Sequence, residues 1–279
     1  MIENILLCLE GSPSAESARR TTIMLARELG ASVVGLAIID EPDIRAGAAT
    51  GIGGASFKRE RDDALVADAH KQASDWVALF ERRCREAQVP ATALEVVGRP
   101  ASTILAEADK RDLTVLGRDA NFRFETEADD VKTREAILHR AACPVLIVPE
   151  NASGPIGAKV VIAYDGSGAA RRAIESFAAS GLARARDVTV ATVDDSGEQA
   201  WEMASRGVAL LSEFGIGAKP HNIVSALSNI DALFGFANES GAGLIVMGAF
   251  AHSRLAQLFH GSVTRGLVEK TTIPLYLKH

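Results

Sequence analysis

Short apolar runs alternate with amphipathic segments along the whole chain, and this alternation predicts strands and helices in turn. The apolar runs are mostly continuous rather than interrupted by polar residues, as expected of parallel strands that helices cover on both faces. The alternating order favours right-handed crossovers and a doubly wound α/β fold. In the first half of the chain we expect strands at Ile5–Leu9, Ser32–Ile39, Leu94–Val97, Leu113–Leu116 and Val145–Val148.

The segments between these runs place their apolar residues on one stripe of a helix. The first helix is predicted over Pro13–Leu29, with Ser12 as its expected N-cap. In the second half, Ser167 is the matching N-cap, and the helix that follows carries Ile174 and Phe177 on its apolar stripe. Both halves therefore start with a strand, a short polar turn and an amphipathic helix.

Three sequence blocks recur in the same order in the two halves, offset by 130 to 155 residues, which indicates a duplication. The Gly/Pro/Ser-rich stretch 151–157 separates domains that we place at 1–150 and 157–279. We predict two tandem, doubly wound, parallel five-stranded sheets flanked by helices, and an internal pseudo-dimer if the closing strands pair. The matching blocks are Ile5–Ser12 with Val160–Ser167, Leu113–Gly117 with Leu244–Gly248, and Cys143–Val148 with Ile273–Leu277.

Composition and charge narrow the classes of protein that remain. Hydrophobic residues make up 47% of the chain and charged residues 24%, as in globular proteins, and no apolar run is long enough to cross a membrane. Residues 1–150 hold 19 Lys and Arg against 25 Asp and Glu, and residues 151–279 hold 11 of each. Since neither half is basic, we expect no nucleic-acid partner. The chain opens without a signal-peptide pattern, so we expect a cytoplasmic protein.

The spacing of cysteines and histidines matches no metal-site or catalytic motif. Cys8, Cys84 and Cys143 lie far apart, and we expect them to be small buried side chains. None of the six histidines has the H-x-x-x-H spacing. The glycine-rich stretch Gly47–Gly54 lacks the Lys-Ser/Thr ending of a P-loop, and we interpret it as an insert, with a lid as one interpretation. We therefore expect no metal ion and no catalytic residue.

The loop after the fourth strand of the second half has the features of a phosphate-binding loop. It starts at Gly248 and closes with Gly261, Ser262 and Thr264 at the start of an amphipathic helix. Glycine lets backbone N–H groups approach a ligand closely, and the hydroxyls and the helix N-terminus can donate to a phosphate. The alternative is that Ser262 only caps the helix.

Asp165 follows the first strand of the second half. Ligands of doubly wound sheets bind beyond the carboxyl ends of the strands, so this carboxylate is placed to accept a hydrogen bond from a ribose hydroxyl or an adenine amino group. An Asx turn leading into the helix is the alternative role. The sequence leaves both interpretations open.

The Asp-Gly-Ser after the opening strand, the glycine-bearing loop that ends in Gly-Ser, and the closing strand opened by proline resemble the universal stress protein family in its tandem form. The resemblance covers nearly the whole chain and implies a Rossmann-like, adenine nucleotide alpha hydrolase-like fold that binds ATP or AMP, with or without Mg²⁺. In this family the last strand mediates pairing. The resemblance assigns adenosine contacts to Asp165 and Val193, and phosphate contacts to Gly248, Gly261, Ser262, Val263 and Thr264, with Ala251 and His252 beside them. Ala251 stands where the family pattern has glycine.

The first half departs further from this pattern. Glu10 replaces the aspartate, and no Gly-Ser precedes the helix after the fourth strand. The acidic stretch Glu125–Asp130 would favour the helix N-terminus and repel a phosphate. We therefore predict that the first half has lost nucleotide binding, although Arg118 and Arg123 leave open a different anionic ligand.

These features favour a non-enzymatic regulatory or stress-response protein that binds ATP or AMP in its second half. A slow ATPase using the same pocket is the first alternative; no clear metal carboxylate stands beside the Gly-Ser loop, and His252 or His260 would have to serve as the base. A scaffold without any ligand is the second. Intramolecular pairing of the two domains is expected, and a further homodimer stays open.

Overall fold

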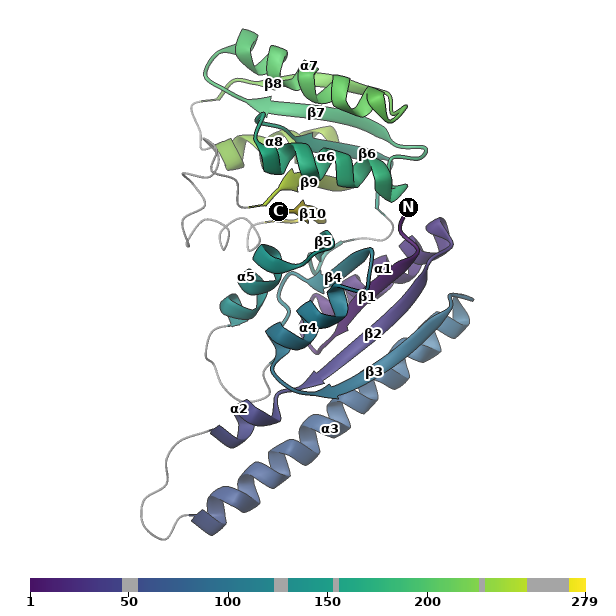
Figure 1. Ribbon diagram of the computed structural model, residues 1–279, viewed down its shortest axis with the longest axis vertical. Coiled ribbons are helices and arrows are strands. Elements are labelled where there is room, and N and C mark those ends of the chain that lie inside the picture. Colours follow the sequence, from purple (N-terminus) through teal and green to yellow (C-terminus); the bar gives the residue numbers. More distant parts are fainter. Residues whose placement is uncertain (47–54, 123–129, 153–155, 226–228, 250–270) are drawn as a thin grey trace.

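The computed structural model describes residues 1–46, 55–122, 130–152, 156–225, 229–249 and 271–279 (Figure 1). In the N-terminal half the elements in chain order are β1 (Asn4–Leu9), α1 (Ala15–Leu29), β2 (Ser32–Ile39), α2 (Glu41–Ala46), α3 (Ala55–Glu86), β3 (Ala91–Val97), α4 (Pro100–Ala108), β4 (Leu113–Gly117), α5 (Asp130–Arg140) and β5 (Val145–Val148). The C-terminal half follows with β6 (Lys159–Ala163), α6 (Gly168–Ser180), β7 (Asp187–Val193), α7 (Gly197–Glu213), β8 (Ala218–Ile223), α8 (Asn229–Ser240), β9 (Leu244–Gly248) and β10 (Leu275–Lys278).

The described strands form one ten-stranded sheet in the order β3-β2-β1-β4-β5-β10-β9-β6-β7-β8. Within each half all neighbouring strands are parallel. The two halves meet where β5 and β10 pair antiparallel, with Tyr276 opposite Leu146. The predicted five-stranded parallel sheets are thus confirmed, and their closing strands join them into a single pseudo-symmetric sheet.

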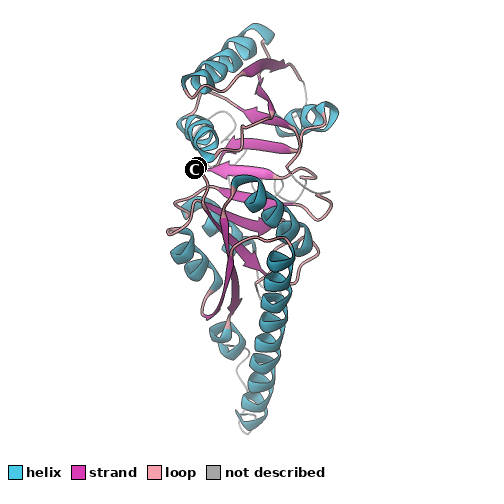
Figure 2. Ribbon diagram, turned by 90° about the vertical axis from the view of Figure 1, so that its right-hand side faces the viewer, coloured by secondary structure: helices cyan, strands magenta, loops and turns pink. Residues whose placement is uncertain are grey.

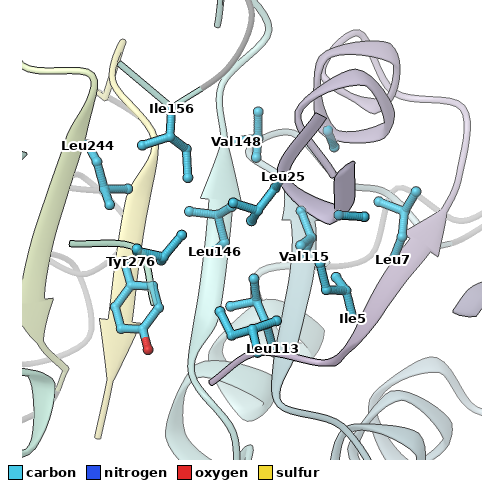
Figure 3. Packing of buried hydrophobic residues seen from close by; sticks show 14 of the residues in the cluster. Ile5, Leu7, Leu25, Leu113, Val115, Leu146, Val148, Ile156, Leu244 and Tyr276 are labelled. Carbon is cyan, nitrogen blue, oxygen red and sulfur yellow. The ribbon is translucent and has the colours of Figure 1, made fainter. Parts of the chain in front are cut away.

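Helices cover both faces of this sheet (Figure 2). On one face, α1, α3, α6 and α7 pack over a core that includes Leu25, Phe80 and Phe177. On the other face, α4, α5 and α8 pack over a second core. The first core runs without a break across the junction, where Leu146 of β5 lies beside Tyr276 of β10 (Figure 3). The halves therefore share a hydrophobic core as well as backbone hydrogen bonds.

Hydrogen bonds outside the pairing of the strands also hold the two halves together. Arg186 donates a 2.7 Å hydrogen bond to Glu28, and its side chain is almost fully buried. The backbone N–H of Ile2 donates to the carbonyl of Ser180 at 3.0 Å. Lys278 donates to the carbonyl of Ala142 at 2.6 Å. These contacts fix the orientation of the two halves at several separate points.

The N-cap prediction is confirmed in one half and wrong in the other. The side chain of Ser167 accepts a hydrogen bond from the backbone N–H of Ala170 at the start of α6. In the N-terminal half the N-cap of α1 is Ser14, and it makes no capping bond. Ser12 does not cap the helix, because its hydroxyl donates to the carboxylate of Glu10 at 2.8 Å.

The helix α3 is 32 residues long, which corresponds to about 48 Å. Its buried residues include Ala73, Phe80 and Cys84, which lie in its second half. Its first half, together with α2, extends past the end of the sheet (Figure 1), and Phe57 on that part is exposed. The stretch 47–54, interpreted as an insert or lid, lies outside the described residues.

Of the helices described, none is long and apolar enough to span a lipid bilayer.

Candidate functional site

In each half the carboxyl ends of the central strands lie at one edge of the sheet, and we call the region just beyond them the crevice of that half. The strand order switches direction between β1 and β4 in the N-terminal half, and between β6 and β9 in the C-terminal half. Such switch points are where doubly wound sheets bind ligands. Glu10 and Gly117 stand at the first switch point, and Asp165 and Gly248 stand at the second. The two crevices can therefore be compared residue by residue.

In the N-terminal half, the side chain of Glu10 fills the crevice. Glu10 is only 1% exposed. Its carboxylate accepts hydrogen bonds from the backbone N–H and the hydroxyl of Ser12, at 2.6 and 2.8 Å, and from the backbone N–H of Asn121 at 3.4 Å. The backbone donors that a ligand anion would use are thus bonded to the protein's own carboxylate.

Ser14 closes the crevice beside Glu10. Its hydroxyl accepts a 2.9 Å hydrogen bond from the backbone N–H of Asp119, in the turn after β4, and lies 3.0 Å from the hydroxyl of Ser12. A Cβ placed on Gly117 would lie 2.5 Å from this hydroxyl and 3.1 Å from the Glu10 carboxylate. The turns after β1 and β4 are therefore in direct contact at Gly117.

Burial raises the pKa of the Glu10 carboxyl above its ordinary value of 4.5, although hydrogen bonds from Ser12 and Asn121 oppose the shift. The folded protein then holds this proton more tightly than the unfolded chain does. The contribution of Glu10 to stability is therefore complete below pH 4.5 and is lost as the pH rises through the raised pKa.

We expect Glu10→Gln to abolish this part of the pH dependence, because glutamine is neutral, its Oε1 can accept from the backbone N–H groups of Ser12 and Asn121, and its NH₂ can donate to the Ser12 hydroxyl. Urea unfolding from pH 4.5 to neutral should show a flatter profile than wild type, with no loss of stability at neutral pH. The exposed Glu3→Gln serves as the control and should keep the wild-type slope. An unchanged slope in Glu10→Gln would show that the Glu10 carboxyl does not titrate differently on folding.

The side chain of Arg118 takes part in the junction between the halves. Its guanidinium makes two hydrogen bonds to the carboxylate of Asp119, at 3.0 and 3.1 Å, and donates to the carbonyl of Thr271 at 3.1 Å. Arg134 in turn donates to the carbonyl of Arg118 at 2.7 Å. These contacts give Arg118 a structural role. Arg123, the other arginine considered for an anionic ligand, lies outside the described residues, as does Glu125–Asp129.

In the C-terminal half, Asp165 is one methylene shorter than Glu10 and is only partly buried. Its Oδ1 accepts a 3.0 Å hydrogen bond from the backbone N–H of Ser167, which is the Asx turn considered from the sequence. Within the part of the chain that the structure describes, its Oδ2 has no hydrogen bond. The turn therefore uses one carboxylate oxygen and leaves the other without a hydrogen bond to the described residues.

Gly248 lets the end of β9 approach the first turn of α6 closely. A Cβ at this position would lie 2.5 Å from the carbonyl carbon of Ala169 and 2.5 Å from the backbone nitrogen of Ala170. The helix N-terminus, with its partial positive charge, thus stands directly at the switch point.

Val193 ends β7 and pairs with Ile223 of β8. The neighbouring Thr192 is buried, and its hydroxyl donates a 2.6 Å hydrogen bond to the carbonyl of Tyr164. Asp194 accepts a 3.0 Å bond from the backbone N–H of Ser196, so a second Asx turn stands next to that of Asp165. The sequence reasoning missed this second turn, although the Asp-x-Ser spacing after a strand is the same in both.

The remaining candidate residues lie outside the described part of the chain. They are the members of the loop after β9, namely Ala251, His252, Gly261, Ser262, Val263 and Thr264. The structure thus brings Asp165, Gly248 and the end of β7 to one edge of the sheet.

The three cysteines are free and buried, as the sequence predicts. Cys8 and Cys143 lie in the core beneath α4 and α5, and Cys84 lies in the core on the opposite face. In the ranges that the structure describes, no group of three or more His, Cys, Asp or Glu side chains comes together.

Comparisons of the sequence and of the structure with known proteins all find members of the same family. The model of the universal stress protein family matches residues 1–149 and again residues 158–277. A universal stress protein of Synechocystis is 23% identical over 98% of this chain and 99% of its own length. The crystal structure of a universal stress protein from Archaeoglobus fulgidus superposes with a TM-score of 0.68 at 15% identity, covering 99% of this chain and 97% of that one.

A structure of an Arabidopsis thaliana family member with AMP bound covers 53% of this chain and 91% of its own, at 14% identity and a TM-score of 0.36. The two family-model matches together span nearly the entire sequence, and the two halves repeat the same strand order about a shared junction. This chain therefore belongs to the universal stress protein family and carries the family's unit twice in tandem.

Proposed function

We propose that this protein binds an adenine nucleotide, ATP or AMP, in its C-terminal unit, residues 157–279, and acts as a cytoplasmic regulatory or stress-response protein. The N-terminal unit, residues 1–150, supports the fold and does not bind nucleotide. The observation that carries this proposal is the contrast between two carboxylates at equivalent positions. Glu10 is buried and hydrogen-bonded by the protein, whereas Asp165 is only partly buried and uses one carboxylate oxygen in its turn.

A phosphate group is disfavoured in the N-terminal crevice for two reasons. The carboxylate of Glu10 already accepts the backbone N–H groups of Ser12 and Asn121. A nucleotide would also bring further negative charge next to a group that burial already disfavours in its charged form. Displacing Glu10 would leave a buried acid without its partners, which is costly.

In the C-terminal crevice, the proposed contacts follow the switch point of the sheet. Asp165 accepts from the ribose or the adenine, and the backbone of Val193 meets the adenine. The phosphates lie near Gly248, where the N-terminus of α6 approaches β9. We assign further phosphate contacts to Gly261, Ser262, Val263 and Thr264, with Ala251 and His252 beside them. The proposal covers binding of the nucleotide with or without Mg²⁺.

The decisive measurement is calorimetric titration of the full chain with ATP, ADP and AMP. We expect binding at one site per chain. Asp165→Asn should weaken it about tenfold, the order expected for a lost hydrogen bond to a charged acceptor, while an asparagine side chain preserves the Asx turn. Asp187→Asn is the matched control, because Asp187 lies in the same unit at the start of β7 and pairs with the exposed Lys219.

Two results would refute the proposal. Absence of heat and of thermal stabilisation with all three nucleotides would favour a scaffold without ligand. Equal weakening by Asp165→Asn and Asp187→Asn would place the nucleotide elsewhere.

Release of phosphate from ATP that is lost in Ser262→Ala would instead identify a slow ATPase in the same crevice. Sedimentation with and without nucleotide would show whether occupancy changes a homodimer equilibrium.

A further inference from the structure

A cavity lies between α1 and the end of α3, apart from both crevices. It has a volume of about 290 Å³, close to the lower limit of about 300 Å³ for sites that bind small molecules. Its apolar lining comes from Ile23, Met24 and Ala87, and its charged lining includes Arg19 and Arg83. Nothing in the proposed nucleotide function uses these residues.

Arg19 is an unusual member of this lining because it is a cation only 4% exposed to solvent. Its Nη1 donates to the carboxylate of Glu16. Its Nε is buried and, among the residues that the structure describes, has no hydrogen-bond partner. A buried donor without a partner is costly, so an acceptor that reached this nitrogen would offset part of that cost.

Glu16 shows what kind of group fits between the arginines. One of its carboxylate oxygens pairs with Arg19, and the other lies 3.8 Å from Nη2 of Arg83. The Glu16 side chain is 56% exposed, so it can turn into solvent when another carboxylate takes its place, and the buried guanidinium of Arg19 then keeps an ionic partner. Its carboxylate thus occupies a position that a carboxylate of another molecule can take.

The charge of the lining favours an anion once Glu16 turns away. Arg20 also lines the cavity, and among the described residues it donates to the backbone carbonyl of Ala152, which is a neutral acceptor. Glu86 is the other acid in the lining, and it lies 3.8 Å from Arg83. Three guanidiniums would then face a single carboxylate, and planar guanidiniums bind carboxylates with two parallel hydrogen bonds.

We propose that this cavity binds an amphipathic carboxylate of short chain length. Its head group takes the place of the Glu16 carboxylate between Arg19 and Arg83, and its alkyl chain covers Ile23, Met24 and Ala87. This site is independent of the nucleotide crevice, so its presence or absence leaves the proposed nucleotide function untouched.

The test is titration of the full chain with octanoate, and with octanamide as the neutral molecule of equal chain length. Octanoate should bind at one site and octanamide should bind at least about tenfold more weakly, because the amide lacks the charge that the guanidiniums pair with. Glu16→Gln should strengthen octanoate binding about fivefold, because no ion pair then has to be broken.

Arg83→Met keeps the apolar stem but removes the charge, and it should weaken octanoate binding about tenfold. The control is Arg85→Met on the same helix, which is exposed and outside the cavity lining and should leave the affinity unchanged. The proposal fails if octanamide binds as well as octanoate, if Arg83→Met and Arg85→Met behave alike, or if neither wild type nor Glu16→Gln binds octanoate at millimolar concentration.

Discussion

Replacing Gly248 by alanine is expected to destabilise the protein by about 3 kcal/mol, at the upper end of the usual cost of overpacking. The added Cβ would lie 2.5 Å from backbone atoms of Ala169 and Ala170. These atoms belong to the first turn of α6 and cannot rotate away as a side chain can. The helix must move as a whole, and its buried residues must move with it.

Two other glycines provide controls for this prediction, and urea unfolding followed by circular dichroism measures all three. In Gly117→Ala the Cβ meets the Ser14 hydroxyl at 2.5 Å, and a rotation of Ser14 relieves the contact at the cost of its hydrogen bonds to Asp119 and Ser12, about 2 kcal/mol. In Gly217→Ala the Cβ has no neighbour within 4 Å, so the change should be within about 0.5 kcal/mol. If Gly248→Ala were as stable as Gly217→Ala, the close approach of β9 to α6 would be wrong.

Gly248 has two roles that a single substitution cannot separate. The sequence assigns it to the phosphates, and the structure makes it necessary for packing between β9 and α6. A loss of nucleotide binding in Gly248→Ala would follow from either role. Asp165→Asn is the cleaner test, because it removes a charge from the crevice and preserves the turn that leads into α6.

The sheet could be predicted from the sequence because its strands are long apolar runs bounded by turn residues. Errors at their ends are small; for example, β3 begins at Ala91 rather than Leu94. The sequence alone does not establish that β5 pairs with β10, because the apolar pattern of a closing strand does not say which strand lies beside it. The structure supplies that partner.

The positions of single polar side chains could not be predicted in the same way. From the sequence, Glu10 only replaces the aspartate after the first strand; in the structure it is buried because the turns after β1 and β4 converge on it. That convergence also draws Ser12 away from the helix cap. Arg19 of α1 is likewise buried, because α3 packs against α1 and covers it. Each depends on contacts between segments far apart in the sequence, which local periodicity does not encode.

Tyr276→Ala is expected to destabilise the protein by about 4 kcal/mol, in the range for removal of a large aromatic side chain from a core. Tyr276 is fully buried in β10. Its ring makes an edge contact with Phe177 at a centroid distance of 6.2 Å, and its hydroxyl bonds to that of Ser176 at 2.8 Å. Tyr276→Phe keeps the packing and loses only this hydrogen bond, so it should cost about 1 kcal/mol.

The location of the damage matters more than its size, because β10 is the strand through which the halves meet. A cavity at Tyr276 opens beside Leu146 of the N-terminal half (Figure 3), so both halves should lose stability. Native-state hydrogen exchange should therefore show faster exchange in β5 as well as in β9. Phe80→Ala removes a similar volume beneath α3, against Gly35 of β2, and should speed exchange in the N-terminal half first. If Tyr276→Ala left β5 as protected as in wild type, the two units would be separate cores that merely touch.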